Sequence, residues 1–231
     1  MYKQKKEAFA GLGMTIVTPS HWLAGLVKES FLKDYPVQVI HNGIDLNVFQ
    51  PRPSNFREKY HIAQDKFLLL GVAVQWVPRK GADAMIRLAQ KLNPEKFQIV
   101  LVGTDDTIDQ QLPSNIISIH RTSNQTELAE IYTAADLFVN PTREDTFPTV
   151  NMESLACGTP VLTYRTGGSP EMLDDSTGKV VDCDDEEALY QAVLSISDHP
   201  FERNACLRRA ADFDEKDRFY KYVELYRRVL G

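Results

Sequence analysis

Two adjacent cations stand directly before a glycine and a predicted helix, as Arg79, Lys80 and Gly81 in the segment QWVPRKGAD. The free N–H groups and the dipole of a helix N-terminus favour anions, and two positive side chains strengthen that field. A phosphate or diphosphate is therefore the natural ligand of this turn. Solvated loop cations would give the same short motif, so the motif alone does not decide between the two interpretations.

A second candidate site lies in NPTREDTFPTVNMES, residues 140–154. A helix is predicted to begin at Pro148 or Thr149, because a proline at a helix start loses no hydrogen bond. The backbone amides of Thr149, Val150 and Asn151 would then lack helical partners. This helix start predicts a second group of atoms that bind an anion.

Three carboxylates lie in the same segment, those of Glu144, Asp145 and Glu153. Glu153 follows the predicted helix start by about one turn, where it would accept hydrogen bonds from hydroxyl groups, as an acidic residue does with a ribose. Alternatively, Glu144 and Asp145 are ordinary loop acids and Glu153 is a favourable charge in a first helical turn. The spacing leaves both interpretations open.

A third turn contains the pair Gly167–Gly168, followed by Ser169, Pro170 and Glu171 as a helix start. The pair would either let a ligand approach the backbone or simply turn the chain. Other chemistries lack their motifs: GxGxxG, GxSxG and the Walker lysine pattern are all absent. The three cysteines, Cys157, Cys183 and Cys206, have no metal-binding spacing, so we expect reduced thiols and no metal site.

The elements that position these turns are predicted to be parallel strands covered by helices. Short runs rich in Val, Ile, Leu and Phe alternate with segments of helical period. Strands that are apolar on both faces are typical of a doubly wound, Rossmann-like α/β domain, whose ligands bind at the carboxyl ends of the strands. The predicted strands are residues 15–18, 37–40, 67–74, 97–103, 116–120, 136–140, 160–164 and 178–181.

The composition agrees with a globular protein and excludes several others. The 231 residues include 26 Lys and Arg against 32 Asp and Glu, for a net charge of −6, and 43% are hydrophobic. Collagen, a disulfide framework and a disordered tail are excluded. The negative charge argues against nucleic acid as a partner. No apolar stretch has the length of a membrane span or of a signal peptide, so we expect a cytoplasmic protein.

One complete α/β domain is predicted for residues 56–215, with smaller pieces on either side. Residues 42–55 combine an Asn-Gly turn with prolines, which indicates a linker. Residues 1–41 hold too few elements to bury a sheet and need a partner surface. Residues 216–231 predict an amphipathic helix whose apolar stripe packs on residues 1–41 or mediates self-association. The stripe consists of Phe219, Tyr222, Val223, Tyr226, Val229 and Leu230.

Together these segments resemble the carboxyl-terminal half of a family 4 retaining glycosyltransferase of the GT-B fold, over essentially the whole chain. TPSHWLAGLV and VIHNGIDLNVFQP look like the end of that family's amino-terminal domain and its interdomain linker. WVPRKGADAMIRLA resembles its donor diphosphate segment. IYTAADLFVNPTREDTFPTVNMESLACGTPVLTYRTGGSPE is similar to its most specific signature, especially in a bacterial subset that makes cell-surface polysaccharides.

The resemblance implies a role for each candidate residue. The diphosphate of a nucleotide-sugar would be bound by Arg79, Lys80, Thr149, Val150 and Asn151, and its ribose by Glu153. The donor sugar would meet Thr146, Phe147 and Pro148, and the nucleobase would meet the backbone of His120, Arg121 and Thr122. No metal is implied, because cations and helix amides stabilise the departing nucleoside diphosphate.

Two positions depart from the family pattern. The family usually has two Glu separated by seven residues, but eight residues lie between Glu144 and Glu153, whereas Asp145 has the family spacing. The catalytic carboxylate that faces the donor sugar is therefore either Glu144 or Asp145. The arginine that the family carries upstream of its lysine falls on Gln75, and Arg79 is the candidate to replace it.

For the whole protein, the resemblance implies retaining transfer of a hexosyl group from a UDP-, GDP- or ADP-sugar to a saccharide or lipid-linked acceptor. The acceptor would bind mostly in a domain that this chain lacks, so we expect the chain to be inactive alone. The full-length enzyme would work at the inner face of the membrane, in cell-surface polysaccharide synthesis. The alternatives are a non-catalytic nucleotide-sugar sensor or partner subunit, and an epimerase of the same fold.

Overall fold

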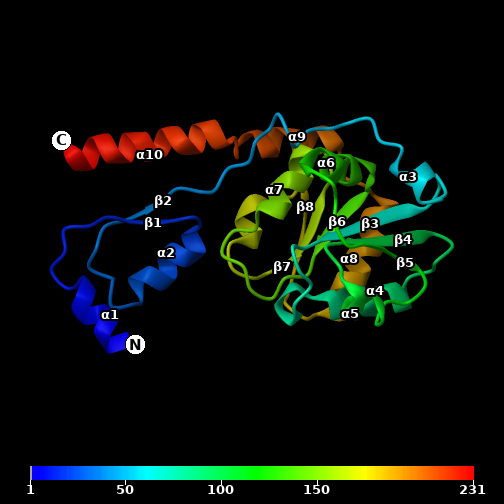
Figure 1. Ribbon diagram of the computed structural model, residues 1–231, viewed down its shortest axis with the longest axis horizontal. Helices are drawn as coiled ribbons and strands as arrows, with labels where there is room; N and C mark the ends of the chain where they lie inside the picture. Colours follow the sequence, from blue (N-terminus) through cyan, green and yellow to red (C-terminus); the bar gives the residue numbers. More distant parts are fainter. Residues whose placement is uncertain (1) are drawn as a thin grey trace.

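A parallel six-stranded sheet forms the centre of the protein in a computed structural model that describes residues 2–231 (Figure 1). The strand order is β5-β4-β3-β6-β7-β8. The bounds are β3 Phe67–Val72, β4 Phe97–Val102, β5 Ile116–Ile119, β6 Leu137–Asn140, β7 Val161–Tyr164 and β8 Gly178–Val181. The predicted parallel α/β fold is confirmed, and the ends of every predicted strand lie within two residues of the observed ends.

Helices cover both faces of this sheet. One face packs against α6 (Gln125–Ala134), α7 (Thr149–Ala156) and α9 (Arg203–Ala211), and the other against α4 (Ala82–Lys91) and α8 (Glu186–Asp198). Successive residues of a strand point to opposite faces, so Leu68 and Leu70 belong to the first core and Leu69 to the second. Because both faces are covered, every residue of β6 and β7 is buried.

The remaining elements of this large domain, residues 56–214, are short. They are α3 (Phe56–Lys59), η1 (Pro78–Lys80), α5 (Asp106–Asp109) and η2 (Ser169–Met172). Cys157 and Cys206 are buried, Cys183 is exposed, and all three are free thiols, as predicted. Within residues 2–231, no helix combines the length and the apolar character needed to cross a membrane.

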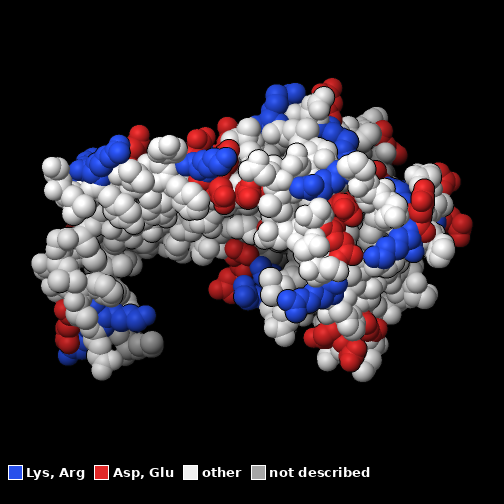
Figure 2. Space-filling view, turned by 45° about the horizontal axis from the view of Figure 1, so that its top comes forward, with Lys and Arg blue, Asp and Glu red and all other residues white. Residues whose placement is uncertain are grey.

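The amino-terminal segment, residues 2–41, lies beside the large domain and is much smaller. It consists of α1 (Tyr2–Phe9), β1 (Ile16–Thr18), α2 (His21–Lys28) and β2 (Val37–Val39), with β1 and β2 paired in parallel. Its buried residues are Thr18, Ser20, Ala24 and Ile40. Figure 2 shows a hollow between the α1–α2 part of this segment and the large domain.

The last helix, α10 (Glu215–Leu230), leaves the large domain and runs alongside β1 and β2 (Figure 1). Its start is fixed to the linker, because the Ile44 amide donates to Phe213 O at 2.9 Å and the Glu215 amide donates to Ile44 O at 3.1 Å. The preceding Gly43 permits this approach, since a Cβ there would lie 2.5 Å from the Cα of Glu215. Near the other end, Arg228 donates to the side chain of Gln38 on β2.

The amino-terminal segment leaves most of the apolar stripe of α10 uncovered, so packing on that segment, the first of the two predicted outcomes, is not borne out for the stripe as a whole. Self-association, the second, stays a prediction. Phe219 and Tyr226 are 61% and 58% exposed, and Leu225 is the buried residue of the helix. The reason is size: two three-residue strands offer too little surface to cover a helix of 16 residues. An apolar face of α10 therefore remains uncovered within residues 2–231.

Candidate functional site

The candidate site lies where the strand order reverses. The chain runs from β3 through β4 to β5 on one side, then returns to β6 beside β3 and continues through β7 to β8 on the other. In open parallel sheets, ligands bind at the carboxyl ends of the strands at such a reversal. Two adjoining cavities lie at this place, and both are lined by Val72, Ala73, Val74, Thr149 and Val150.

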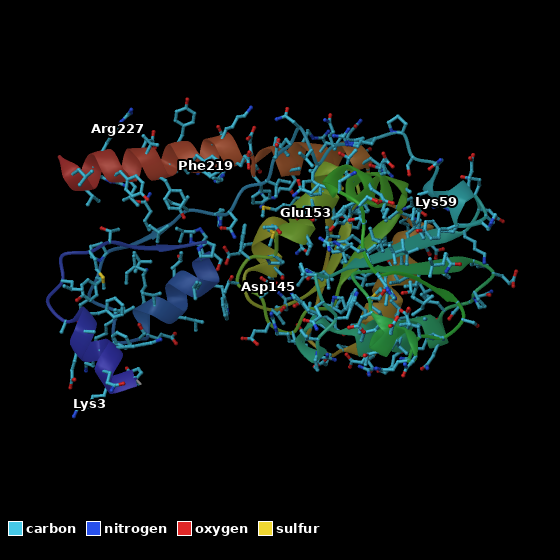
Figure 3. The ribbon with its side chains drawn as sticks, in the orientation of Figure 1. Lys3, Lys59, Asp145, Glu153, Phe219 and Arg227 are labelled. Atoms are coloured by element: carbon cyan, nitrogen blue, oxygen red, sulfur yellow. The ribbon has the colours of Figure 1, made fainter. Side chains whose placement is uncertain are left out.

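The first cavity, of about 620 Å³, brings together the two anion-binding turns predicted from the sequence. Lys80 and Arg79 come from the turn after β3, and the residues facing them come from the loop after β6. The predicted residues that line it are Arg79, Lys80, Asp145, Thr146, Phe147, Pro148, Thr149 and Val150. Figure 3 places Asp145 at the edge of the large domain that faces the amino-terminal segment.

The two turns are held together by backbone contacts. Gly81 has a positive φ of 77°, and a Cβ there would overlap the carbonyl oxygen of Pro141. The amide of Arg143 donates to Arg79 O at 2.7 Å, and the Thr142 hydroxyl donates to the same oxygen at 3.3 Å. A glycine is therefore required where the turn after β3 presses against the loop after β6.

Lys80 and Asp145 form an ion pair inside the first cavity. Lys80 Nζ lies 2.7 Å from Asp145 Oδ2, and the two side chains are 22% and 20% exposed. Charge-assisted hydrogen bonds of this length are stronger than neutral ones. A phosphate that binds Lys80 must therefore either share the ammonium group with the Asp145 carboxylate or displace that carboxylate.

The structure separates the two candidate carboxylates. Asp145 lines the first cavity, whereas Glu144 is exposed and does not belong to its lining. The Glu144 contribution is its backbone oxygen, which lies 3.4 Å from Arg79 Nη1 and accepts from the Thr142 hydroxyl at 3.2 Å. The prediction of Glu144 as a residue facing a donor sugar is thus not supported by its position, because its side chain is exposed outside the lining of the first cavity.

Helix α7 begins at Thr149, with Pro148 as its N-cap at φ −70°. Proline has no side-chain acceptor, so the amides of Thr149 and Val150 have no capping partner there. Both residues line both cavities. Since the helix dipole adds to their positive field, this N-terminus can bind an anion shared between the two cavities.

Asn151 does not fit its predicted role. Its amide donates to Pro148 O at 3.2 Å, its Oδ1 accepts from Asn140 Nδ2 at 2.8 Å, and its side chain is fully buried outside both cavities. The first turn of α7 closes early with this bond, which removes the third amide from the group available to an anion. The prediction of a free amide is therefore wrong for Asn151, whereas anion binding by the amides of Thr149 and Val150 stays a prediction.

Glu153 lies one turn into α7 and lines the second cavity, of about 490 Å³ (Figure 3). Burial raises the pKa of this carboxyl, and hydrogen bonds from Thr149 and Tyr132 counteract part of that rise. The Tyr132 hydroxyl donates to Glu153 Oε2 at 3.2 Å, which orients the carboxylate. Such a group can accept hydrogen bonds from two neighbouring hydroxyls of a ligand.

The remaining predicted residues, His120, Arg121 and Thr122, line the far end of the second cavity, at the end of β5. His120 Nε2 lies 2.7 Å from Asp109 Oδ2, and this bond raises the pKa of His120. The hydrogen bond from Ser118 lowers the pKa of Asp109 in turn. Because its imidazole is engaged by Asp109 of α5, His120 can meet a ligand through its backbone.

Two polar residues of the first cavity are not among the site residues predicted from the sequence. Asn42 and Gln75 both line the first cavity. The sequence indicates only a turn at the Asn-Gly pair, and at Gln75 only the position where the family arginine is missing. The signal that could have identified both is a polar side chain in a suitable place: Gln75 follows a strand end and Asn42 begins the linker.

The glycine pair after β7 packs against protein atoms. A Cβ at Gly167 would overlap the carbonyl oxygen of Asp145, and a Cβ at Gly168 would overlap that of Thr146. The pair therefore lets two backbone segments approach each other. This supports a structural role in the turn, one of the two predicted interpretations, and not a close approach of a ligand.

Two groups of histidines and carboxylates have ligand atoms within 4.8 Å of one another: His21, His41 and Glu171, and Asp106, Asp109 and His120. In the first group, Glu171 already accepts hydrogen bonds from two backbone amides. In the second, Asp109 already accepts from Ser118 and His120. The expectation that the chain needs no metal stays a prediction.

A family model described as "Glycosyl transferases group 1" matches residues 64–199. Among curated relatives, D-inositol 3-phosphate glycosyltransferase 2 of Catenulispora acidiphila is 29% identical over 199 residues, which are 78% of this chain and 45% of that protein. The chain thus spans about half the length of the curated relatives it matches.

Two solved structures are similar to almost the whole chain. Sucrose-phosphate synthase of Thermosynechococcus elongatus has a TM-score of 0.85 at 22% identity, covering 99% of this chain and 61% of that one. The Anabaena protein HepE in complex with UDP-glucose has a TM-score of 0.81 at 17% identity, covering 97% and 66%. Both likenesses support the fold, and both similar proteins are longer than this chain.

Proposed function

Because the chain belongs to the group 1 glycosyl transferases, we propose that it is the donor-binding part of a glycosyltransferase that uses a nucleotide-sugar. One observation carries the proposal: two cavities of different chemistry adjoin at the strand reversal and share the N-terminus of α7. The first is lined by Arg79, Lys80 and the loop residues 145–148, and the second by the Glu153 carboxylate and the end of β5. The parts of a nucleotide-sugar follow the same order, with the sugar and the diphosphate matching the first cavity and the ribose and the base matching the second.

The proposed placement follows the chemistry of each lining group. The diphosphate binds Lys80, Arg79 and the amides of Thr149 and Val150, because these are the positive groups of the first cavity. The ribose hydroxyls bind Glu153. The donor sugar faces Thr146, Phe147, Pro148 and Asp145, and the base meets the backbone at His120, Arg121 and Thr122.

In the reaction, the bond between the sugar anomeric carbon and the diphosphate oxygen breaks, and a bond from an acceptor hydroxyl oxygen to that carbon forms. The acceptor proton leaves with the nucleoside diphosphate or with a base. Negative charge grows on the departing diphosphate, where Lys80 and the α7 amides stabilise it. These groups are the reason to propose catalysis without a metal cofactor.

Finer features of the proposal rest on the motif resemblance alone. They are retention of anomeric configuration, membership of family 4, a saccharide or lipid-linked acceptor bound by a further domain, and a role in cell-surface polysaccharide synthesis. We place the full-length enzyme in the cytoplasm, at the inner face of the membrane. The relative from Catenulispora acidiphila is named for an inositol phosphate acceptor, which makes a phosphorylated cyclitol a further acceptor to assay.

Titration calorimetry with UDP, GDP and ADP, each free and as its glucose or mannose derivative, tests the proposal. The nucleotide with one of the three bases is expected to bind with clearly higher affinity than the other two. The sugar derivative of that nucleotide is expected to bind more tightly than the free nucleotide. Binding by none of the six classes of ligand would contradict the proposal. Binding without any transfer by the full-length protein would favour the non-catalytic subunit.

Chelation tests the proposed independence of metal. EDTA is expected to leave the nucleotide affinity of the chain unchanged, because protein cations and amides take the role of a metal. Loss of binding in EDTA that Mg²⁺ or Mn²⁺ restores would show that the diphosphate is bound through a metal.

A further inference from the structure

Glu171 connects the two parts of the molecule. It belongs to η2 of the large domain, and its two carboxylate oxygens accept hydrogen bonds from the backbone amides of His21 and Trp22, both at 2.8 Å. These amides are the first two of α2 in the amino-terminal segment. The contact joins residues that are 150 positions apart in the sequence.

The free amides at the start of α2 are thereby satisfied. Ser20, the N-cap, accepts from the Leu23 amide at 3.2 Å through its hydroxyl, and Ala24 donates to Ser20 O at 3.1 Å. The amides of His21 and Trp22 have Glu171 as their acceptor. A carboxylate here also meets the positive end of the helix dipole.

The backbone around Glu171 is held firmly on its other side. Arg209 of α9 donates to Glu171 O at 2.8 Å through Nη2 and to Met172 O at 2.9 Å through Nε. The position of the carboxylate is therefore set by the large domain. Any movement of α2 relative to that domain must break or stretch its two bonds.

The turn that leads to Glu171 lies against the loop of the first cavity. Gly167 and Gly168 touch the backbone of Asp145 and Thr146, as described above, and the Thr166 hydroxyl donates to Thr142 O at 2.7 Å. A Cβ at Gly168 would also lie 2.8 Å from the Cβ of Ser20. The same turn thus contacts the cavity loop and the start of α2.

His41, the last residue of the amino-terminal segment, contacts the cavity loop directly. His41 stacks on Phe147 with ring centroids 4.7 Å apart and an interplanar angle of 7°. Its Nδ1 lies 2.9 Å from Pro19 O, which ties the ring to the turn before α2. The cavity loop is therefore packed between the glycine turn and a residue that moves with the amino-terminal segment.

We infer that Glu171 is a positioning residue that holds the amino-terminal segment in the orientation in which the loop 144–148 is ordered to receive the donor sugar. The inference deepens the proposed function and rests on it for the identity of the ligand. Glu171 lies outside the lining of both cavities, so it acts through the loop. Its loss is expected to weaken binding of the sugar part of the donor more than binding of the nucleotide.

Amide hydrogen exchange in the 231-residue chain tests the contact itself. In Glu171→Gln, one of the two accepting oxygens is replaced by an amide donor, and the amides of residues 21 and 22 are expected to exchange about ten-fold faster than in the wild type. Asp175→Asn is the matched control, because Asp175 is exposed in the same region and its substitution removes the same charge. Unchanged protection in Glu171→Gln would overturn the inference.

A second pair of variants removes the donor instead of the acceptor. His21→Pro deletes the first amide, and proline is favourable at this helix position, where the preceding residue already has extended backbone at φ −147° and ψ 155°. His21→Ala keeps the amide and removes only the ring. His21→Pro is expected to speed exchange at residue 22, while His21→Ala leaves it as in the wild type; equal behaviour of the two would contradict the inference.

Calorimetry with UDP, GDP and ADP and their glucose or mannose derivatives gives the readout that a merely structural role would not move. Glu171→Gln is expected to reduce the preference for the sugar derivative over the free nucleotide about ten-fold, with the affinity for the free nucleotide within about two-fold of the wild type. An unchanged preference would overturn the positioning role. If the wild type binds none of these ligands, the proposed function fails, and the exchange measurement alone decides whether Glu171 holds the two parts together.

Discussion

The large domain and the amino-terminal segment are built from the same kind of strand but differ in what covers it. All four residues of β6 are buried, whereas all three residues of β2 are only partly buried. Both strands are rich in branched apolar residues and pair in parallel with a neighbour. The difference is that helices cover both faces of β6, while a single short helix and part of α10 accompany β2.

The sequence of a strand alone therefore does not determine how much the strand contributes to the stability of the fold. Hydrophobic burial stabilises a strand in proportion to the apolar area removed from water. We therefore expect the large domain to fold as an independent unit and the amino-terminal segment to depend on its contacts with Glu171, the linker and α10. The first cavity, which Asn42 of the linker helps to line, lies beside the boundary between these two regions, whereas the second is lined by the large domain alone.

The largest expected effect separates the two regions directly. Val139→Ala on β6 is expected to lower the free energy of unfolding by about 2 kcal/mol, because the side chain is fully buried. Val39→Ala on β2 is the matched substitution at a partly buried site and is expected to cost less than about 1 kcal/mol. Urea denaturation measures both, and equal losses would contradict the difference between the regions.

Lys80→Ala tests the contribution of the large domain to the first cavity. Removing the ammonium group from the first cavity is expected to lower the affinity for a nucleoside diphosphate about 10- to 100-fold, and less at high salt. Lys59→Ala is the control, because Lys59 lies on the opposite side of the large domain in Figure 3 and pairs with Glu127 at 3.4 Å. Calorimetry showing the same affinity for both variants would exclude Lys80 as the phosphate ligand.

Glu153→Gln is expected to weaken nucleotide binding about ten-fold and, at neutral pH, to raise Tm. Burial raises the pKa of Glu153 above its ordinary value of 4.5, so the folded state binds this proton more tightly than the unfolded state. The wild type therefore loses stability as pH rises from the unfolded pKa through the folded pKa. The Tm advantage of the variant should be full above the folded pKa and disappear as pH falls toward 4.5.

A constant Tm difference between Glu153→Gln and the wild type across that pH range would show that burial of the charge is not the cause. Glu144→Gln is a suitable control, because Glu144 is exposed.

The smallest expected effect concerns Arg79, the residue inferred to replace the family arginine. Its guanidinium makes a long contact of 3.4 Å with Glu144 O, so Arg79→Ala is expected to reduce nucleoside diphosphate affinity only about three- to ten-fold. Stability should not change. Full affinity in Arg79→Ala would sink the replacement hypothesis and leave Lys80 and the α7 amides as the diphosphate ligands.

Much of the fold was predictable, because fully buried parallel strands leave continuous apolar runs such as FLLLGVAV and FQIVLVG. The position of the site followed from the same reasoning, since strand ends gather at one edge of the sheet. The choice between Glu144 and Asp145 did not follow, because side-chain direction in a loop depends on backbone angles that no periodicity reports.

Three other features could not be predicted, for physical reasons. The sequence predicts a free amide at Asn151, but this amide donates to Pro148 O and closes the first turn of α7 early. Residue types alone do not determine whether such a local hydrogen bond forms. The bonds from Glu171 to α2 join residues far apart in the chain, and nothing in either segment indicates the other. The exposed face of α10 likewise depends on how much surface the amino-terminal segment offers.

The central claim is that the two adjoining cavities hold the parts of one nucleotide-sugar, and a crystal structure of the chain with its preferred nucleotide-sugar tests it most directly. The account predicts phosphate oxygens within hydrogen-bond distance of Lys80 Nζ and of the Thr149 and Val150 amides, with ribose hydroxyls on Glu153 and the base beside residues 120–122. A nucleotide bound elsewhere, or one whose diphosphate lies away from the start of α7, would contradict it.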